Sequence, residues 1–192
     1  MISKGILKEA RDHAAWNVER LLPHAEKGSP IVGLEPSCLL TIRDEYPDLL
    51  RSERAGVVAR QSFLFEEFLI RERDAGRLSL NFKSNGKKAL LHGHCHQKAL
   101  VGSEPTAAGL RWAGFEVTEV DSGCCGMAGS FGFEKEHYDL SLAVANRRLI
   151  PAVKAASPEV EVVASGISCR QQIEHLAGRR AKHPAELLWE QF

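Results

Sequence analysis

The sequence predicts an α/β protein whose mostly parallel sheets are covered by helices. Short apolar runs typical of buried strands alternate along the chain with amphipathic stretches typical of helices. Strands that alternate with helices pair in parallel, because each helix crosses over between two strands. A weak internal repeat gives the same order of elements twice.

The first part of the chain predicts two helices around a buried strand. Residues 4–26 place most of their apolar side chains on one helical face, and Pro30 marks the exit from this helix. Residues 31–34 form the candidate strand. Residues 61–74 predict a second helix, which Gly76 ends.

The second part continues the alternation. Strands are expected at 88–91, 115–120 and 160–164, and helices at 105–113, 134–156 and 167–176. The helix over 134–156 should break at Pro151, because proline lacks the backbone N–H that a helix interior needs.

The repeat relates the two parts of the chain. The run Arg20-Leu21-Leu22-Pro23 matches Arg148-Leu149-Ile150-Pro151, and after a short insertion Ser37-Cys38 matches Ser168-Cys169. Each copy runs helix, strand, turn, Ser-Cys, helix. We therefore expect two pseudo-symmetric repeats, residues 1–85 and residues 86–192. The first-copy counterpart of Cys124-Cys125 would fall just before Met1, so we expect the first repeat to be truncated at its N-terminus.

Composition excludes several classes of partner. Lysine plus arginine and aspartate plus glutamate both number 25, so the formal net charge is zero and no electrostatic case exists for nucleic acid. No apolar run approaches a membrane span, and charged residues follow the N-terminus too soon for a signal peptide. We expect a cytoplasmic protein, with membrane attachment through partners and homo-oligomerisation left open.

The five cysteines carry the functional signal. An odd number in a chain without an export signal favours metal or redox thiols over a disulfide framework. Cys124 and Cys125 are adjacent, which holds their Cα atoms about 3.8 Å apart, closer than in an ordinary disulfide. Direct bonding between these two thiols is therefore unfavourable.

The cysteines follow the ends of predicted strands. Cys95, the Cys124-Cys125 pair and Cys169 each come directly after one, and the carboxyl ends of parallel strands meet at one edge of a sheet. Four thiols distant in sequence should thus converge. Cys38 occupies the corresponding loop of the first repeat, and pseudo-symmetry could bring it to the same region.

Convergent thiolates suit zinc or an iron-sulfur cluster. Adjacent thiolates are awkward around one zinc ion, whereas each can bind a different iron of a cluster. Gly123 and Gly126 would let the backbone approach the cofactor and offer N–H groups to its sulfurs. Single buried cysteines are commonly plain apolar residues, but the set at strand ends favours metal binding.

The run "HGHCH" adds His92, His94 and His96 around Cys95. Alternating imidazoles could bind a metal directly. Hydrogen bonding around the cysteine loop, or exposure, is the favoured interpretation. The sequence offers no Ser-His-Asp set, phosphate loop or dinucleotide fingerprint, so no catalytic acid or base is assigned.

Four segments resemble a known family. They are "LEPSCLLTIRDEYPDL", "HGHCHQKAL", "SGCCGMAGSFGFEKEHYDLSLAVA" and "GISCRQQI", and they resemble the cysteine-rich CCG domain of iron-sulfur oxidoreductases. The sequences of these motifs are most similar to the C-terminal part of fusion proteins with an FAD-linked oxidase domain, of the glycolate, D-lactate or D-2-hydroxyglutarate dehydrogenase type. The resemblance covers about residues 30 to 185.

The resemblance implies cluster ligands. In the family, each repeat supplies a single cysteine, an adjacent pair and a closing Cys-x-x-Cys around a 4Fe-4S cluster. Cys95, the Cys124-Cys125 pair and Cys169 match these positions, and Cys38 matches the last cysteine of the first repeat. The chain departs from the pattern at Glu35 and Gly166, which occupy the first position of each closing motif.

The resemblance also implies an electron-transfer domain. A flavin in a separate upstream FAD domain would oxidise a 2-hydroxy acid, and iron-sulfur centres here and in a ferredoxin-like domain would pass the electrons to an acceptor. This chain alone should not be catalytic. The alternatives are a structural zinc or subunit-docking module, and a site that reduces a disulfide or quinone directly.

Overall fold

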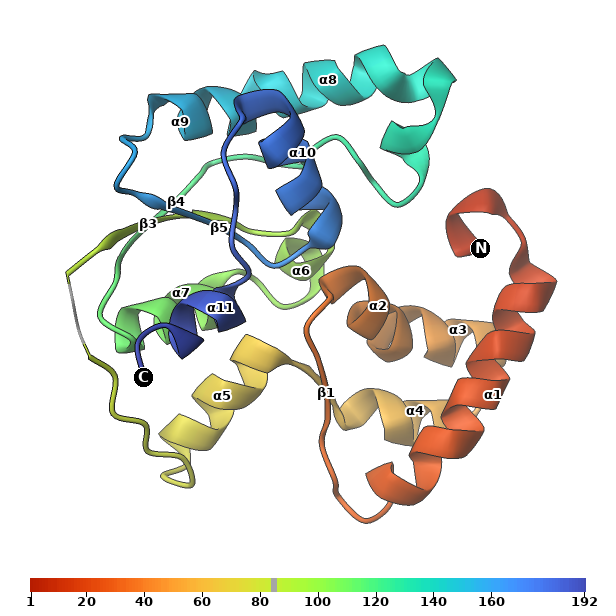
Figure 1. The fold of residues 1–192 in the computed structure, drawn as a ribbon. Coiled ribbons are helices and arrows are strands. Elements are labelled where there is room, and N and C mark those ends of the chain that lie inside the picture. The colour runs from red at the N-terminus through yellow and green to blue at the C-terminus, as the bar shows by residue number, and fades with distance from the viewer. Residues whose placement is uncertain (84–85) are drawn as a thin grey trace. The chain divides into compact units, whose positions relative to one another are not determined.

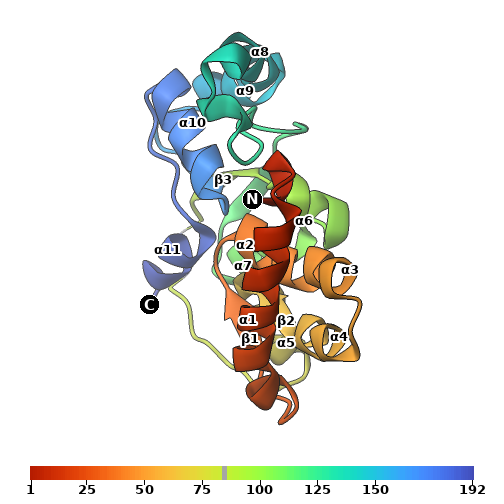
Figure 2. The ribbon, with the colours of Figure 1, turned by 90° about the vertical axis from the view of Figure 1, so that its right-hand side faces the viewer.

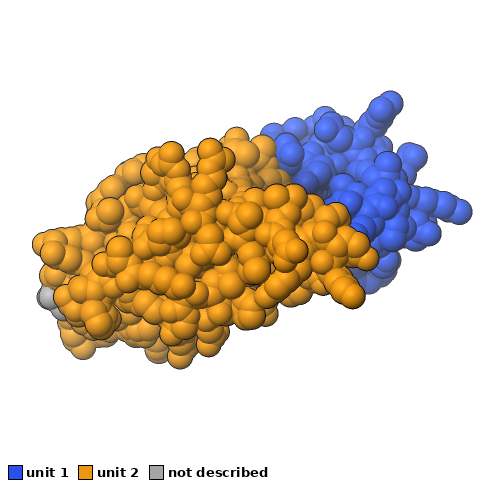
Figure 3. Space-filling model, turned by 90° about the horizontal axis from the view of Figure 1, so that it is seen from above, with its two compact units in different colours: residues 1–65 blue, residues 66–192 orange. Residues whose placement is uncertain are grey.

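The computed structural model describes residues 1–83 and 86–192 and divides into two compact units. The first unit is Met1–Phe65 and the second is Glu66–Phe192, shown in different colours in Figure 3. The expected α/β class is confirmed in both units, because each contains a parallel sheet with helices around it.

The first unit is mostly helical (Figure 1). Its long helix α1 (Leu7–Ala25) buries residues at helical spacing, among them Ala14, Val18 and Leu22. These side chains pack with Tyr46, Ala55 and Val58 in one hydrophobic core. The other elements are η1 (Ile2–Lys4), β1 (Ile31–Gly33), α2 (Pro36–Leu40), η2 (Thr41–Glu45), α3 (Tyr46–Leu50), α4 (Glu53–Arg60) and β2 (Ser62–Leu64).

The predicted helix over 61–74 is wrong at its start. Ser62–Leu64 form β2, which pairs in parallel with β1, and helix α5 runs only over Phe65–Asp74. Val32 lies opposite Phe63 in this pairing. The apolar run "SFLF" fits a strand and a helix equally well by periodicity, and its strand partner lies far away in sequence.

The second unit is built on a three-stranded parallel sheet with the order β4-β3-β5. After α5, the elements of this unit in chain order, the three strands included, are β3 (Lys88–His92), α6 (Cys95–Leu100), α7 (Glu104–Trp112), β4 (Glu116–Glu119), η3 (Phe131–Phe133), η4 (Lys135–His137), α8 (Tyr138–Arg147), α9 (Leu149–Ala155), β5 (Glu161–Ala164), α10 (Ile167–Ala177) and α11 (Pro184–Trp189). In β3, Leu91 lies opposite Glu119 of β4 and Val163 of β5.

Helices lie on both sides of this sheet. Figure 1 shows α8, α9 and α10 on one side and α7 and α11 on the other, and α8 to α10 also lie together in Figure 2. The core between the sheet and α8 to α10 contains fully buried Leu149, Ile150, Val162 and Ile173. Cys125 and Cys169 belong to the same core, so the cysteines at the sheet edge are held by well-packed elements.

The break predicted at Pro151 occurs instead at Arg148. Arg148 has φ −145° and ψ −45° and separates α8 from α9. Pro151 falls within the first turn of α9, where backbone N–H groups have no partner inside the helix. Proline is therefore tolerated at this position, and the helix continues to Ala155.

The order helix, strand, Ser-Cys, helix is present in both units. In the first unit α1 and β1 lead to α2, where Cys38 is the third residue of the helix. In the second unit α9 and β5 lead to α10, where Cys169 is again the third residue. The positions of Cys38 and Cys169 in their elements agree with the repeat found in the sequence.

Candidate metal centre

Three parallel strands deliver the cysteine-bearing segments of the second unit to one edge of the sheet. His92 is the last residue of β3 and Cys95 is the first residue of α6. The Cys124-Cys125 pair lies in the loop after β4, and Cys169 lies in the first turn of the helix after β5. The carboxyl ends of parallel strands share one edge, which explains why segments so distant in sequence meet here.

The four thiols form a chain of interactions. Cys95 interacts with Cys124, Cys124 with Cys125, and Cys125 with Cys169. None of the four is in a disulfide. The structure thus brings together the four cysteines that the sequence placed after strands. Cys38 is exposed on α2 of the first unit, and its part in the same centre stays a prediction.

Protons are distributed unevenly over these thiols. Hydrogen bonding to Cys124 and burial raise the pKa of Cys95, and hydrogen bonds to Cys124 and Cys169 raise the pKa of Cys125. The same hydrogen bonds lower the pKa of Cys124. The Cys125 hydrogen bond also lowers the pKa of Cys169 well below its usual value, in spite of burial. Along this chain of contacts the thiolates of Cys124 and Cys169 alternate with the thiols of Cys95 and Cys125, an arrangement that a cation would stabilise.

The loop that carries the cysteine pair depends on Gly126. Its φ of +93° is unfavourable for other residues, and a Cβ atom there would lie 2.2 Å from the carbonyl oxygen of Ser141. The Gly126 backbone N–H donates to Cys124 Sγ at 3.3 Å. Gly123 is exposed, and a Cβ atom there would meet nothing within 4 Å. Of the two glycines expected beside a cofactor, Gly126 has the contact with a thiol.

Polar side chains outside the cysteine set hold this loop in place. Arg148 forms an ion pair with Asp121, and the Lys98 ammonium donates to the carbonyl oxygen of Ser122. The Ser122 hydroxyl interacts with His92 Nδ1 at 2.8 Å. The sequence assigned no role at the site to Lys98, Asp121, Ser122 or Arg148, although Lys98 and Ser122 lie within the quoted motifs. Their contacts join segments that lie far apart in the chain, so no local sequence pattern indicates them.

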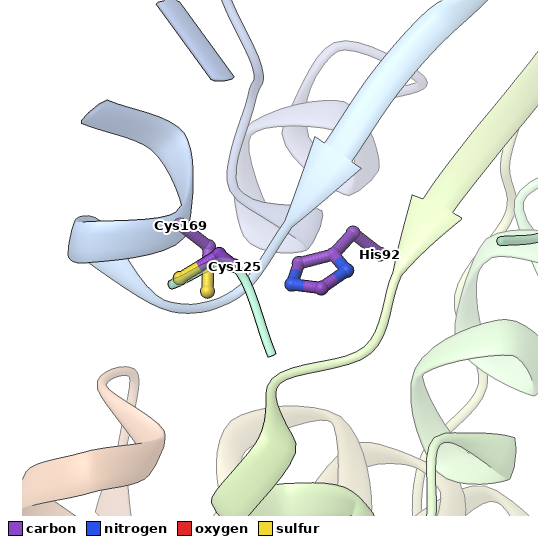
Figure 4. A group of neighbouring side chains, drawn as sticks. All are labelled: His92, Cys125 and Cys169. Atoms are coloured by element: carbon purple, nitrogen blue, oxygen red, sulfur yellow. The ribbon is translucent and has the colours of Figure 1, made fainter. Parts of the chain in front are cut away.

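Two histidines are buried beside the thiols. His92 is 1% exposed and His94 is 6% exposed. A nitrogen of His92 and the sulfurs of Cys125 and Cys169 all lie within 4.8 Å of one another. Figure 4 shows the His92 ring facing the two sulfurs. His92, Cys125 and Cys169 therefore form a group with the spacing and donor types of a metal site.

Gly166 makes room for the second histidine. Its backbone (φ −73°, ψ 134°) is accessible to any residue, so no conformational reason requires glycine. A Cβ atom there would lie 2.4 Å from His94 Cδ2 and 3.2 Å from Cys169 Sγ. The space beside Gly166, where the resemblance would place a cysteine, is thus filled by the His94 ring.

The donor set of the second unit suits a soft metal. Four sulfurs and two buried imidazoles are the ligand types of zinc sites and iron-sulfur clusters. His92 Nε2 and His94 Nδ1 are buried and make no hydrogen bond of normal geometry in the part of the chain that the structure describes, although the His92 ring contributes to the lowered pKa of Cys169. Such unsatisfied nitrogens beside thiolates are typical of a cation site.

Among residues 1–83 and 86–192, no helix combines the length and apolar character that crossing a bilayer requires.

Curated relatives match nearly the whole chain. It is 33% identical over 190 residues to a subunit of the anaerobic glycerol-3-phosphate dehydrogenase of Escherichia coli K12, covering 98% of this chain and 47% of that protein. It is 29% identical over 189 residues to the D-2-hydroxyglutarate dehydrogenase of the same organism, covering 97% of this chain and 18% of that enzyme. The corresponding enzyme of Pantoea ananatis is 28% identical over 191 residues.

The chain thus spans about half the length of the first relative and less than a fifth of the others. No protein-family model matches the sequence. No solved structure matches it either.

Proposed function

We propose that this chain is an iron-sulfur electron-transfer domain of a flavin-linked 2-hydroxyacid dehydrogenase. The observation that carries the proposal is the contact between Cys95, Cys124, Cys125 and Cys169, which three parallel strands bring together. The similarity to a subunit of one dehydrogenase and to part of another supports an oxidoreductase setting.

A 4Fe-4S cluster, when bound, would take up and release single electrons. The four cysteines would hold it, and the loop clamped by Lys98 and Arg148 would fix the adjacent pair. The Gly126 N–H already donates to Cys124 Sγ, and such hydrogen bonds to sulfur adjust the potential of a cluster. Burial of Cys125 and Cys169 would keep water from one side of the site.

The partners we propose are an FAD-binding oxidase domain and a ferredoxin-like iron-sulfur domain of the same protein or complex. The chain covers only part of its relatives, which leaves room for such domains in them. The flavin would oxidise the hydroxy acid and this domain would carry electrons onward, so this chain alone would have no dehydrogenase activity. A cytoplasmic location, with attachment to a membrane only through partners, belongs to the same proposal.

A structural zinc site is the second candidate. The compact group of His92, Cys125 and Cys169, with ligand atoms within 4.8 Å of one another, specifically favours it, because one ion can bridge such a group. Under this alternative the chain would be a docking module without redox function.

Anaerobic reconstitution separates the two candidates. The chain is incubated with ferrous iron and sulfide, desalted, and analysed for iron, sulfide and zinc. An electron-transfer domain should retain about four irons and four sulfides per chain and show an absorption band that dithionite bleaches. Cys124→Ser in the loop should lose the cluster, whereas His175→Asn, an exposed change on α10, is the control that should keep it. Cys38→Ser tests separately whether Cys38 is a further ligand. Retention of one zinc without sulfide would refute the electron-transfer proposal.

A further inference from the structure

The imidazole of His92 is held in one orientation by a hydroxyl group. His92 Nδ1 lies 2.8 Å from Ser122 Oγ, and Ser122 Oγ in turn donates to the carbonyl oxygen of Val120 at 3.5 Å. The 2.8 Å contact fits either direction of donation, and a hydroxyl that donates to Val120 accepts from Nδ1–H. With the proton on Nδ1, the neutral ring carries a lone pair on Nε2.

In this tautomer the Nε2 lone pair is buried. His92 is 1% exposed, and its Nε2 makes no hydrogen bond of normal geometry among residues 1–83 and 86–192. A buried acceptor without a partner is costly, so such groups usually mark an ion or ligand. A ring held by a hydrogen bond at one nitrogen, with the other nitrogen free, is the usual arrangement of a metal-binding histidine.

Two thiols complete the surroundings of this ring. A His92 ring nitrogen and the sulfurs of Cys125 and Cys169 lie within 4.8 Å of one another, and in Figure 4 the ring faces both sulfurs. Nitrogen and sulfur donors are thus directed at the same point.

We propose that His92 binds the metal directly through Nε2, which makes the centre a mixed imidazole and thiolate site. This inference rests on the proposed function for the identity of the metal, but its geometry holds for any soft cation. An imidazole ligand carries no charge, unlike a thiolate. A cluster with this ligand is therefore easier to reduce than one held by cysteines alone.

The competing role for His92 is a hydrogen bond from a ring N–H to the Cys169 thiolate, and such a bond contributes to the lowered pKa of Cys169. It would require the proton on Nε2 and would leave Ser122 as the donor to Nδ1. The two roles differ in one measurable property, because only a nitrogen bound to the metal shares its unpaired electron strongly. A spectroscopic test therefore separates ligation from hydrogen bonding.

The chain labelled with ¹⁵N-histidine is reconstituted anaerobically with iron and sulfide, reduced, and studied by pulsed electron paramagnetic resonance. We expect a strongly coupled nitrogen that changes with the isotope. The coupling should disappear in His92→Cys while iron and sulfide content is retained, and the potential of that variant should fall. His175→Asn is the matched control, since His175 lies exposed on α10 against the Tyr138 hydroxyl.

Three results would overturn the proposal. The first is only weak nitrogen coupling in the wild type, and the second is strong coupling that persists in His92→Cys. The third is strong coupling that disappears in His94→Ala but not in His92→Cys. Far-UV circular dichroism and urea unfolding check that each variant folds. If His92→Cys does not fold, His92→Asn replaces it in the same measurements.

A second arm uses Co²⁺ alone as the probe and needs no cluster. Loss of His92 should weaken Co²⁺ binding about tenfold or more, whereas His175→Asn should not change it. Cobalt binding that depends on His92 in a chain that assembles no cluster would refute the electron-transfer function and retain the ligand. Equal cobalt affinity in the wild type and His92→Asn would refute the ligand.

Discussion

At the scale of single residues, Gly166 shows how space rather than backbone conformation can require a glycine. A Cβ atom at this position would lie 2.4 Å from His94 Cδ2, closer than real Cβ contacts. His94 is 6% exposed and packs within the second unit, so its ring cannot move aside freely. An added methyl group would therefore strain the packing of the site and lower the stability of the folded chain.

We expect Gly166→Ala to lower the free energy of unfolding of the metal-free chain by about 1–3 kcal/mol, the usual cost of overpacking a core. Urea unfolding followed by circular dichroism measures it. Gly123→Ala is the matched control and should be nearly neutral, since nothing lies within 4 Å of its added Cβ. Equal stability of both variants would show that the His94 ring yields easily.

The candidate site was predicted from the sequence as far as local spacing allows. Cysteines directly after predicted strands indicated that four thiols meet, because a parallel sheet fixes where strand ends lie. The burial of His92 and its contact with Ser122 were beyond such reasoning. A histidine has the same sequence signature whether it is exposed or directed at thiols, and only the folded arrangement distinguishes the two.

At the scale of elements, periodicity predicted the strands of the second unit and most of its helices. The expected strands at 88–91, 115–120 and 160–164 correspond to β3, β4 and β5, with ends differing by one residue. The short helices between β1 and β2 were not predicted, since five-residue helices such as α2 and α3 present hardly more than one turn of pattern. Tertiary packing stabilises them instead.

The position of Pro151 in α9 leads to a prediction at this scale. Pro151 is exposed and lies in the first turn, whereas the Ala152 N–H donates to the Arg148 carbonyl oxygen at 3.2 Å. Pro151→Ala should therefore change stability by less than about 1 kcal/mol, and Ala152→Pro should cost about 3 kcal/mol through the lost hydrogen bond. Thermal and urea unfolding of both variants measure the difference. A large loss in Pro151→Ala would mean that proline stiffens this turn.

At the scale of the whole molecule, positive and negative charges balance, so one buried carboxyl group can dominate how stability changes with pH near neutrality. The chain has zero formal net charge and a pI near 7.1, so general charge repulsion changes little around neutral pH. Glu66 on α5 is 2% exposed, and its Oε1 has no hydrogen-bond partner in the described part of the chain. Burial raises the pKa of Glu66 from 4.5 to about 7.

The sign of its effect follows from proton binding. Between pH 4.5 and about 7 the folded chain holds a proton on Glu66 that the unfolded chain has lost. The free energy of unfolding must therefore decrease as pH rises through this window, and the penalty is complete above it. The lowered pKa values of Glu72 and Glu186 act in the opposite direction, but only below 4.5. The two effects thus occupy separate ranges of pH.

Glu66→Gln should remove this dependence, because a neutral amide of similar size carries no ionisation penalty. At pH 8 the variant should be more stable than the wild type, by up to about 3 kcal/mol for a shift of this size, while at pH 4.5 the two should be similar. Urea unfolding of the metal-free chain across this range gives the slopes, and their difference isolates Glu66. Glu72→Gln is the control that should keep the wild-type slope above pH 4.5, since Arg77 lowers the pKa of the Glu72 carboxyl. Parallel pH profiles for the wild type and Glu66→Gln would contradict the assignment of a protonated Glu66 to the folded state.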